Sequence, residues 1–353
     1  MAVVLLSSPI LLAQEVTTGT KEEATPKSTG KMSYQERIRK QIFADSLDKA
    51  GCKTVTTAPK FDVKNVDGAL QGFLETLIES LAKKKKYVLP GLFHERMRVN
   101  SKMMRQTILE IQSPLRAPIN YSLYRLWAIN TVDGSPNQVL CDDGDFEVLP
   151  YYGYVLQFGL VLQSLGQREL GRIYISIVPT PKGWRIGSLH FQQWTHASGD
   201  FQAWAKAAQK DAEAGFKPAA FIKFDIAAKL VEGSKHFYLP VHKDAIGARD
   251  MVMSRDEWEK EIRSLLKDKE VAFLAGLLAN GGAGLLVRIR VKEQPAHSWV
   301  KDTCRSVVSD LKKAPWSKQL QGVRCNYLLP KEDPSRDGIV GGIYLAFEEE
   351  DKG

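Results

Sequence analysis

The chain carries none of the short motifs that mark the common enzyme classes. It has no Gly-x-Ser-x-Gly of serine hydrolases, no His-Glu-x-x-His of zinc proteases and no dinucleotide-binding fingerprint. The glycine-rich run at 281–284 leads into a predicted strand, and no Lys-Ser or Lys-Thr pair follows it. Because a phosphate-binding loop needs both that pair and a following helix, this run does not predict a nucleotide site. We assign no catalytic residue and predict no cofactor.

Cysteine is scarce: the 353 residues include four, too few for a fold built on disulfides. No pair has Cys-x-x-Cys spacing and none lies near two histidines, so the sequence predicts no metal site. Cys304 lies on the apolar stripe of a predicted helix, and Cys325 lies on the inward face of the following strand. This placement allows a disulfide between them, with two ordinary buried thiols as the alternative. Cys52 and Cys141 lie in segments that the sequence leaves less defined.

Long hydrophobic runs are absent after the first residues, since no later stretch approaches the ~18 apolar residues of a membrane span. Residues 2–13 (AVVLLSSPILLA) have the length of the apolar region of a signal peptide, with Leu11 and Ala13 at the expected cleavage positions. No basic residue precedes Lys21, so a buried element of the first domain is the alternative. The polar residues 14–31 predict a disordered tether. We therefore predict a signal peptide over 1–13 and a periplasmic or secreted protein, or a cytoplasmic one if the run is not cleaved.

Composition and charge indicate a soluble globular protein of two domains. Hydrophobic residues make up 44% and charged residues 25%, and the net charge is +8 with a sequence pI near 9.1. A basic surface favours anionic partners such as nucleic acid, acidic glycans or lipid headgroups, although the same charge also serves solubility. The lysines at 83–86 complement the dipole of a helix that ends there. Together with Arg288 and Arg290 they define an alternative in which the protein binds an anionic polymer.

Residues 32–195 are predicted to form one α+β domain. Apolar spacing indicates helices over 33–49 and 67–86. From about residue 100 the composition changes to that of strands, with turn signals between them, which predicts an antiparallel sheet. The expected strands cover 123–132, 146–163, 172–178 and 184–190.

The rest of the chain is predicted to form a helical hairpin, over 196–240, and a second α+β domain, over 241–353. Ser254 and Glu257 match a capping box at the start of a helix. The following pattern predicts a small sandwich in which helices pack on a β-α-β-β sheet. Its expected elements are a helix over 270–280, a strand over 285–291, a helix over 297–313, a strand over 323–329 and a last strand over 338–348.

The segment from about 67 to 195 resembles the nuclear transport factor two-like superfamily, whose members are cone-shaped α+β domains with a curved sheet wrapped on helices. The resemblance rests on the leading helix that ends near Lys86, the long strands, and the closing Lys-Gly-Trp-Arg-Ile pattern at 182–186. It covers about a third of the chain and implies a pocket between sheet and helices. Such pockets serve ligand binding, dimerisation or isomerase and dehydratase chemistry, and the fold does not choose among these.

Four residues are candidates for lining a ligand pocket: Trp127, Trp184, His190 and Trp194. His190 shares strand parity with Trp184 and Trp194, so we expect these three side chains on one side of the sheet. A structural histidine and core aromatic side chains are the alternative interpretation. The acidic turn Asp142-Asp143-Gly144-Asp145 offers three carboxylates, but it lacks the spacing of a calcium loop and is interpreted as a hairpin turn.

These observations favour an exported, non-enzymatic protein that binds a small ligand or an envelope protein. The first alternative is an enzyme of the isomerase or hydrolase type with a pocket near His190. The second is a binder of nucleic acid or another anionic polymer, whose affinity would fall steeply with salt.

Overall fold

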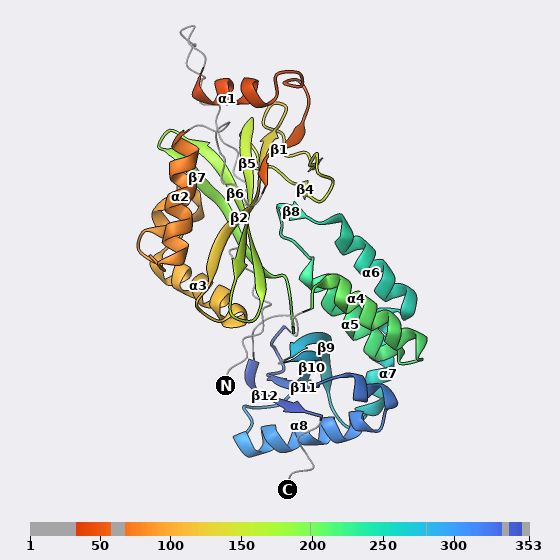
Figure 1. Ribbon diagram of the computed structural model, residues 1–353. Helices are drawn as coiled ribbons and strands as arrows, with labels where there is room; N and C mark the ends of the chain where they lie inside the picture. Colours follow the sequence, from red (N-terminus) through yellow and green to blue (C-terminus); the bar gives the residue numbers. More distant parts are fainter. Residues whose placement is uncertain (1–32, 58–67, 198, 280, 334–338, 348–353) are drawn as a thin grey trace. The chain divides into compact units, whose positions relative to one another are not determined.

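The computed structural model describes residues 33–57, 68–197, 199–279, 281–333 and 339–347 (Figure 1). The predicted signal peptide and tether lie outside these residues. The chain forms two compact units. The first contains the described residues up to Gln192 together with Gly233–Tyr238, and the second contains Gln193–Glu232 and the residues from Leu239 onward. The predicted α+β class is confirmed, with antiparallel pairing in both units.

The first unit is a sheet covered on one face by helices. Its main sheet has five strands in the order β1-β2-β5-β6-β7, and a second sheet has the order β3-β4-β8. Its helices are α1 (Tyr34–Ile42), α2 (Gly68–Ala82) and α3 (Ser101–Leu115), with short 3₁₀ turns at Leu89–Leu92 and Glu95–Met97. Its strands are β1 (Gly51–Thr57), β2 (Asn120–Asn130), β3 (Val139–Leu140), β4 (Glu147–Val148), β5 (Leu156–Leu165), β6 (Leu170–Thr180), β7 (Gly183–Gln193) and β8 (Phe237–Tyr238).

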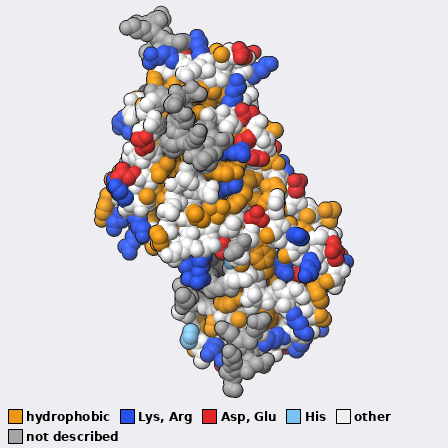
Figure 2. Space-filling view, in the orientation of Figure 1, with side chains coloured by type: hydrophobic (Ala, Val, Ile, Leu, Met, Phe, Trp, Pro, Cys, Tyr) orange, Lys and Arg blue, Asp and Glu red, His pale blue; other side chains and the backbone are white. Residues whose placement is uncertain are grey.

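Helices α2 and α3 lie along one face of the five-stranded sheet (Figure 1). Lys and Arg side chains are spread over the visible surface, with Asp and Glu side chains among them (Figure 2). The expectation of strands from residue 100 is wrong at its start, because α3 occupies 101–115. Met104, Ile108, Ile111 and Leu115 recur at helical spacing and are buried. The Asn100 side chain caps the helix by accepting hydrogen bonds from the Lys102 and Met103 amides, both at 3.0 Å.

The second unit packs helices on a four-stranded sheet of order β12-β11-β10-β9. Strands β10 and β11 run parallel and are connected through α8, whereas the other two pairs are antiparallel. Its helices are α4 (Phe201–Glu213), α5 (Lys217–Leu230), α6 (Pro240–Val252), α7 (Arg255–Leu265) and α8 (His297–Lys312), with a 3₁₀ turn at Pro315–Gln319. Its strands are β9 (Val271–Ala279), β10 (Gly282–Arg290), β11 (Gly322–Leu328) and β12 (Ile339–Ala346).

One expectation for this unit is corrected. The predicted helix over 270–280 is strand β9, because tertiary pairing with β10 outweighs the helix preference of its leucines and alanines. The Asn-Gly sequence at 280–281 is a strong hairpin signal that favours the strand. Within the segment predicted as a helical hairpin, Phe221 and Ile226 of α5 belong to one buried cluster with Leu274 and Leu285 of the sheet.

Candidate functional site

The side of the five-stranded sheet that faces α2 and α3 offers no space for a ligand at its centre. Leu74 and Leu77 of α2, Met104 and Ile111 of α3 and Leu160 of the sheet are all 0% exposed there. They belong to one continuous cluster of packed apolar side chains. The location in which the resemblance implies a pocket is therefore occupied by apolar core.

The opposite face of the sheet carries an aromatic cluster, formed by Trp127, Phe146, Tyr174 and Phe237. Each of these side chains is at most 1% exposed. Ring centroids lie 4.8 Å apart for Trp127 and Phe146, 6.2 Å for Phe146 and Tyr174, and 5.7 Å for Tyr174 and Phe237. Phe237 comes from the segment Gly233–Tyr238, which adds strand β8 to the small sheet. The cluster is a second core, and Trp127 is part of it.

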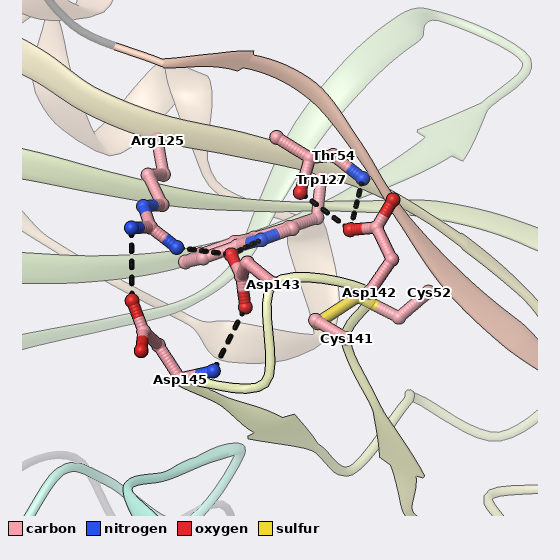
Figure 3. The surroundings of a disulfide bond; sticks show 8 residues. All are labelled: Cys52, Thr54, Arg125, Trp127, Cys141, Asp142, Asp143 and Asp145. Carbon is pink, nitrogen blue, oxygen red and sulfur yellow. Dashed lines mark hydrogen bonds and ion pairs between the residues drawn. A yellow bond between two sulfur atoms is a disulfide. The ribbon is translucent and has the colours of Figure 1, made fainter.

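The acidic turn lies beside this cluster and is anchored by a disulfide (Figure 3). Cys141 at the start of the turn is bonded to Cys52 of β1, with their Cα atoms 4.5 Å apart. The Asp142 carboxylate accepts hydrogen bonds from the Thr54 amide at 2.8 Å and the Thr54 hydroxyl at 2.5 Å. The turn is therefore fixed to β1 at two consecutive residues, Cys141 through the disulfide and Asp142 through its hydrogen bonds to Thr54.

The other two carboxylates of the turn are also engaged by side chains of β2 (Figure 3). Asp143 accepts a hydrogen bond from the Trp127 indole at 2.8 Å and forms an ion pair with Arg125. Asp145 pairs with the same guanidinium at 2.8 Å, and its amide donates to Asp143 at 3.0 Å. Among the described residues no group of three or more His, Cys, Asp or Glu is placed to hold a metal ion. The turn joins β3 to β4, as its interpretation as a hairpin turn implies.

The expected parity of strand β7 is wrong, because the strand is irregular near Gly187. Trp184 and Ile186 pack in the helix-facing core, but Leu189 and Phe191 pack in the same core, so the alternation shifts by one residue. Gly187 leaves room for the Tyr151 ring, which an added Cβ would approach to 3.1 Å. His190 therefore lies on the face opposite Trp184.

His190 contacts the aromatic cluster and has the environment of a neutral structural histidine. Its ring centroid lies 6.4 Å from that of Tyr174. Burial lowers the pKa of His190 to about 4, and a hydrogen bond with the backbone of Gly233 offsets part of that effect. Among the described groups that act on its pKa there is no carboxylate to orient the ring or to raise its basicity. A general base that functions near pH 7 needs a pKa closer to that value.

The four pocket candidates do not form one constellation. Trp127 and His190 contact the same aromatic cluster, whereas Trp184 lies in the helix-facing core against Phe158, with ring centroids 5.2 Å apart. Trp194 belongs to the second unit. Sequence reasoning missed Tyr174 and Phe237; Tyr174 could have been found because its parity is opposite to that of Ile173 and Ile175, but no local signal marks Phe237.

Two of the predicted polymer-binding residues, Arg288 and Arg290, make contacts within the second unit. Arg288 is 1% exposed, and its guanidinium lies 5.2 Å from the centroid of the Phe273 ring. Arg290 donates a hydrogen bond to the Pro330 carbonyl at 2.7 Å. A buried arginine stacked on a ring offers little to the phosphates of a polymer.

The second disulfide joins Cys304 of α8 to Cys325 of β11, with their Cα atoms 5.7 Å apart. Both residues are 0% exposed and belong to the core between helix and sheet. None of the four cysteines of the chain is a free thiol. This is the pairing that the placement of Cys304 and Cys325 in the sequence allows.

The helices in the described part of the chain include none with the length and hydropathy needed to cross a membrane. Comparison with protein-family models, curated proteins and solved structures found no match for this chain.

Proposed function

We propose that the chain is an exported protein that acts by binding a partner at its surface, with one disulfide stabilising each unit. The observation that carries this proposal is the pairing of all four cysteines into two disulfides. Disulfides persist in the periplasm and outside the cell and are rare in a reducing cytoplasm. The signal-like run at 2–13 supports the same compartment.

Binding is favoured over catalysis, because the side chains that could carry a reaction are already paired or lack a suitable pKa. The four thiols are consumed by disulfides, and the three carboxylates of the acidic turn pair with Thr54 or Arg125. His190 is neutral at physiological pH, because its pKa is about 4. The packed apolar core between helices and sheet favours contact through an exposed surface over an internal pocket.

For the first unit we also propose a relationship to the nuclear transport factor two-like superfamily. Its support is the placement of α2 and α3 on one face of an antiparallel sheet whose long strands are β2, β5, β6 and β7. The filled interior is a departure from the ligand-binding members. Among the roles known for that fold, we therefore favour binding to another protein.

Export and oxidation are tested together by expressing two chains in a bacterial host, one complete and one lacking residues 1–13. Alkylation is carried out in denaturant, because the four cysteines are buried in the folded protein. We expect the complete chain outside the cytoplasm with all four cysteines protected from alkylation. The truncated chain should remain in the cytoplasm with reactive thiols. The positive control is a Cys304→Ala variant, in which Cys325 has lost its disulfide partner and should be labelled once the protein is denatured. A complete chain that stays in the cytoplasm with four reactive thiols contradicts the proposal.

A further inference from the structure

The loop that follows α2 combines positive charge with exposed apolar side chains. This basic loop, residues 83–88 (KKKKYV), holds four consecutive lysines followed by Tyr87 and Val88. Tyr87 is 77% exposed and Val88 is 44% exposed, whereas Leu81 before the loop and Leu89 after it are buried. The loop thus presents two apolar side chains to solvent directly beside its lysines.

Backbone hydrogen bonds hold the loop in one conformation. The Lys83 amide donates to the Glu79 carbonyl at 2.9 Å and the Lys85 amide donates to the Ser80 carbonyl at 2.8 Å. The Val88 amide donates to the Lys85 carbonyl at 2.9 Å. Lys84 adopts a positive φ of 54°, which turns the chain after the helix. Tyr87 and Val88 are therefore exposed on a hydrogen-bonded turn, which lowers the cost of ordering the backbone on binding.

The side chains leave a net positive charge on this turn. Glu79 pairs with Lys83 at 2.7 Å and with Lys85 at 3.0 Å. These two lysines hold the pKa of Glu79 at about 2, so its single negative charge is shared by two of the four ammonium groups and offsets one positive charge. Lys86 lies 5.0 Å from the centroid of the Tyr87 ring. Lys83 and Lys84 are exposed, and both can reach an anionic surface in front of the loop.

From these contacts we infer that the basic loop docks on the surface of a bilayer that contains anionic phospholipids. Lysines near such a surface each contribute about 1 kcal/mol through attraction to lipid headgroups. Tyrosine favours the boundary between headgroups and hydrocarbon, and an exposed valine gains by leaving water there. A binding site for nucleic acid uses lysines and sometimes stacked rings, but it has no use for an exposed valine beside them.

The inference is independent of the proposed function, because it is measured on purified protein with vesicles. The full chain is sedimented with vesicles of phosphatidylcholine containing 30% phosphatidylglycerol and with vesicles of phosphatidylcholine alone. We expect binding to the anionic vesicles only, and a steep fall between 50 and 200 mM NaCl. Reduced thiols in the cell would overturn the proposed function and leave this result unaffected.

Matched variants assign the binding to the loop. Replacing Lys83, Lys84 and Lys86 by glutamine should weaken partitioning about 100-fold, since three contributions of about 1 kcal/mol are lost. The control replaces Lys40, Lys49 and Lys182, which are exposed lysines elsewhere in the same unit, and it changes the net charge equally. The control should retain most of the binding. Equal losses in the two triple variants would mean that the overall charge attracts the vesicles, and would overturn the inference.

Substitution of the apolar side chains distinguishes binding to a bilayer from binding to a soluble polyanion. Tyr87→Ser with Val88→Ser should weaken vesicle binding about tenfold without changing retention on heparin. The control is Tyr152→Ser with Leu165→Ser, whose native side chains are 78% and 52% exposed. Unchanged vesicle binding in Tyr87→Ser/Val88→Ser would overturn the inference. It would favour a site for a soluble anionic polymer instead. Thermal unfolding of each variant checks that the fold is intact.

Discussion

The Cys52–Cys141 disulfide of the first unit joins residues 89 positions apart, whereas the Cys304–Cys325 disulfide of the second joins residues 21 apart. The first ties an edge strand to a surface turn beside a two-residue strand. The second crosses from a helix to a central strand inside a packed core. The two units therefore use the same bond for different purposes, one to hold a peripheral sheet and one to reinforce an interior.

This difference indicates where each unit is weakest. The small sheet of the first unit has strands of two residues, and its turn is held by the disulfide, Asp142 and Asp143. Short strands contribute few ladder hydrogen bonds, so side chains and the disulfide must fix the sheet. In the second unit, Val287, Cys304, Val307 and Cys325 are all 0% exposed, and the core remains continuous around the bond.

The largest expected effect comes from removing each disulfide in turn. By loop-closure entropy, Cys52→Ala with Cys141→Ala should lower the free energy of unfolding by about 4.6 kcal/mol, and Cys304→Ala with Cys325→Ala by about 3.3 kcal/mol. Chemical denaturation followed by circular dichroism measures both. A larger loss for the second pair would mean that packing in its core matters more than chain constraint, and the comparison would then be reversed.

Buried carboxylates provide a second comparison. Asp225 of α5 pairs with Lys229 at 2.9 Å and with Arg249 at 3.1 Å, and it accepts a hydrogen bond from the Gly276 amide at 3.2 Å. Asp225→Ala should cost about 3–4 kcal/mol, because Arg249 and Lys229 lose the buried carboxylate that they share and the Gly276 amide loses its acceptor. Asp143→Ala in the first unit should cost about 2–3 kcal/mol, since the Trp127 indole loses its acceptor.

Asp145→Ala is the control for these two variants, because the Asp145 side chain is 56% exposed. It should change the free energy of unfolding by less than about 0.5 kcal/mol. If Asp143→Ala were as mild as Asp145→Ala, the acidic turn would not be structural. The three carboxylates would then be open to a functional interpretation.

The pH dependence of the free energy of unfolding should show that His190 is buried in its neutral form. Its pKa is about 4 in the folded protein and near 6.5 in the unfolded chain, so the unfolded state binds the additional proton between these values. The contribution of His190 to stability should be full above pH 6.5, fall by up to about 3 kcal/mol as the pH decreases to 4, and level off below that. His190→Gln should flatten this part of the profile. An unchanged profile would show that His190 is not the buried neutral group described here.

The smallest expected effect concerns two matched helix caps. Ser33 with Glu36 caps α1, and Ser254 with Glu257 caps α7 by the same reciprocal hydrogen bonds. Ser254→Ala should cost about 1 kcal/mol, because α7 carries Trp258 into the core. Ser33→Ala should cost about half of that, since α1 buries only Ile38 and can open locally. Equal costs would show that α1 unfolds together with the rest of its unit.

The sequence predicted the elements whose signals are local. The capping box at Ser254, the amphipathic helix α8 and the alternating strand β10 need no distant partner to be identified. Strand β9 was missed because its leucines and alanines favour a helix until the chain pairs with β10. Helix α3 was missed because the strand signals that follow it dominated the interpretation.

The candidate site was harder to predict, because it depends on register and on distant segments. One irregularity near Gly187 moves His190 to the face opposite Trp184, and no periodicity argument detects such a shift. Phe237 reaches the aromatic cluster from a segment more than 60 residues after Tyr174 in the chain. The hydrogen bond of Asp143 with Trp127 and its ion pair with Arg125 become apparent only when the turn is placed against β2.

The central claim is that the protein exists in its own cells with both disulfides formed, and the intact mass of protein recovered under alkylation tests it most directly. Cells are lysed directly into denaturant that contains an alkylating reagent, so that the buried cysteines become accessible, and the mass is compared with that of a sample reduced before alkylation. The account predicts no adduct without reduction and four adducts after it. Four adducts in the unreduced sample would contradict the account and would remove the main support for export.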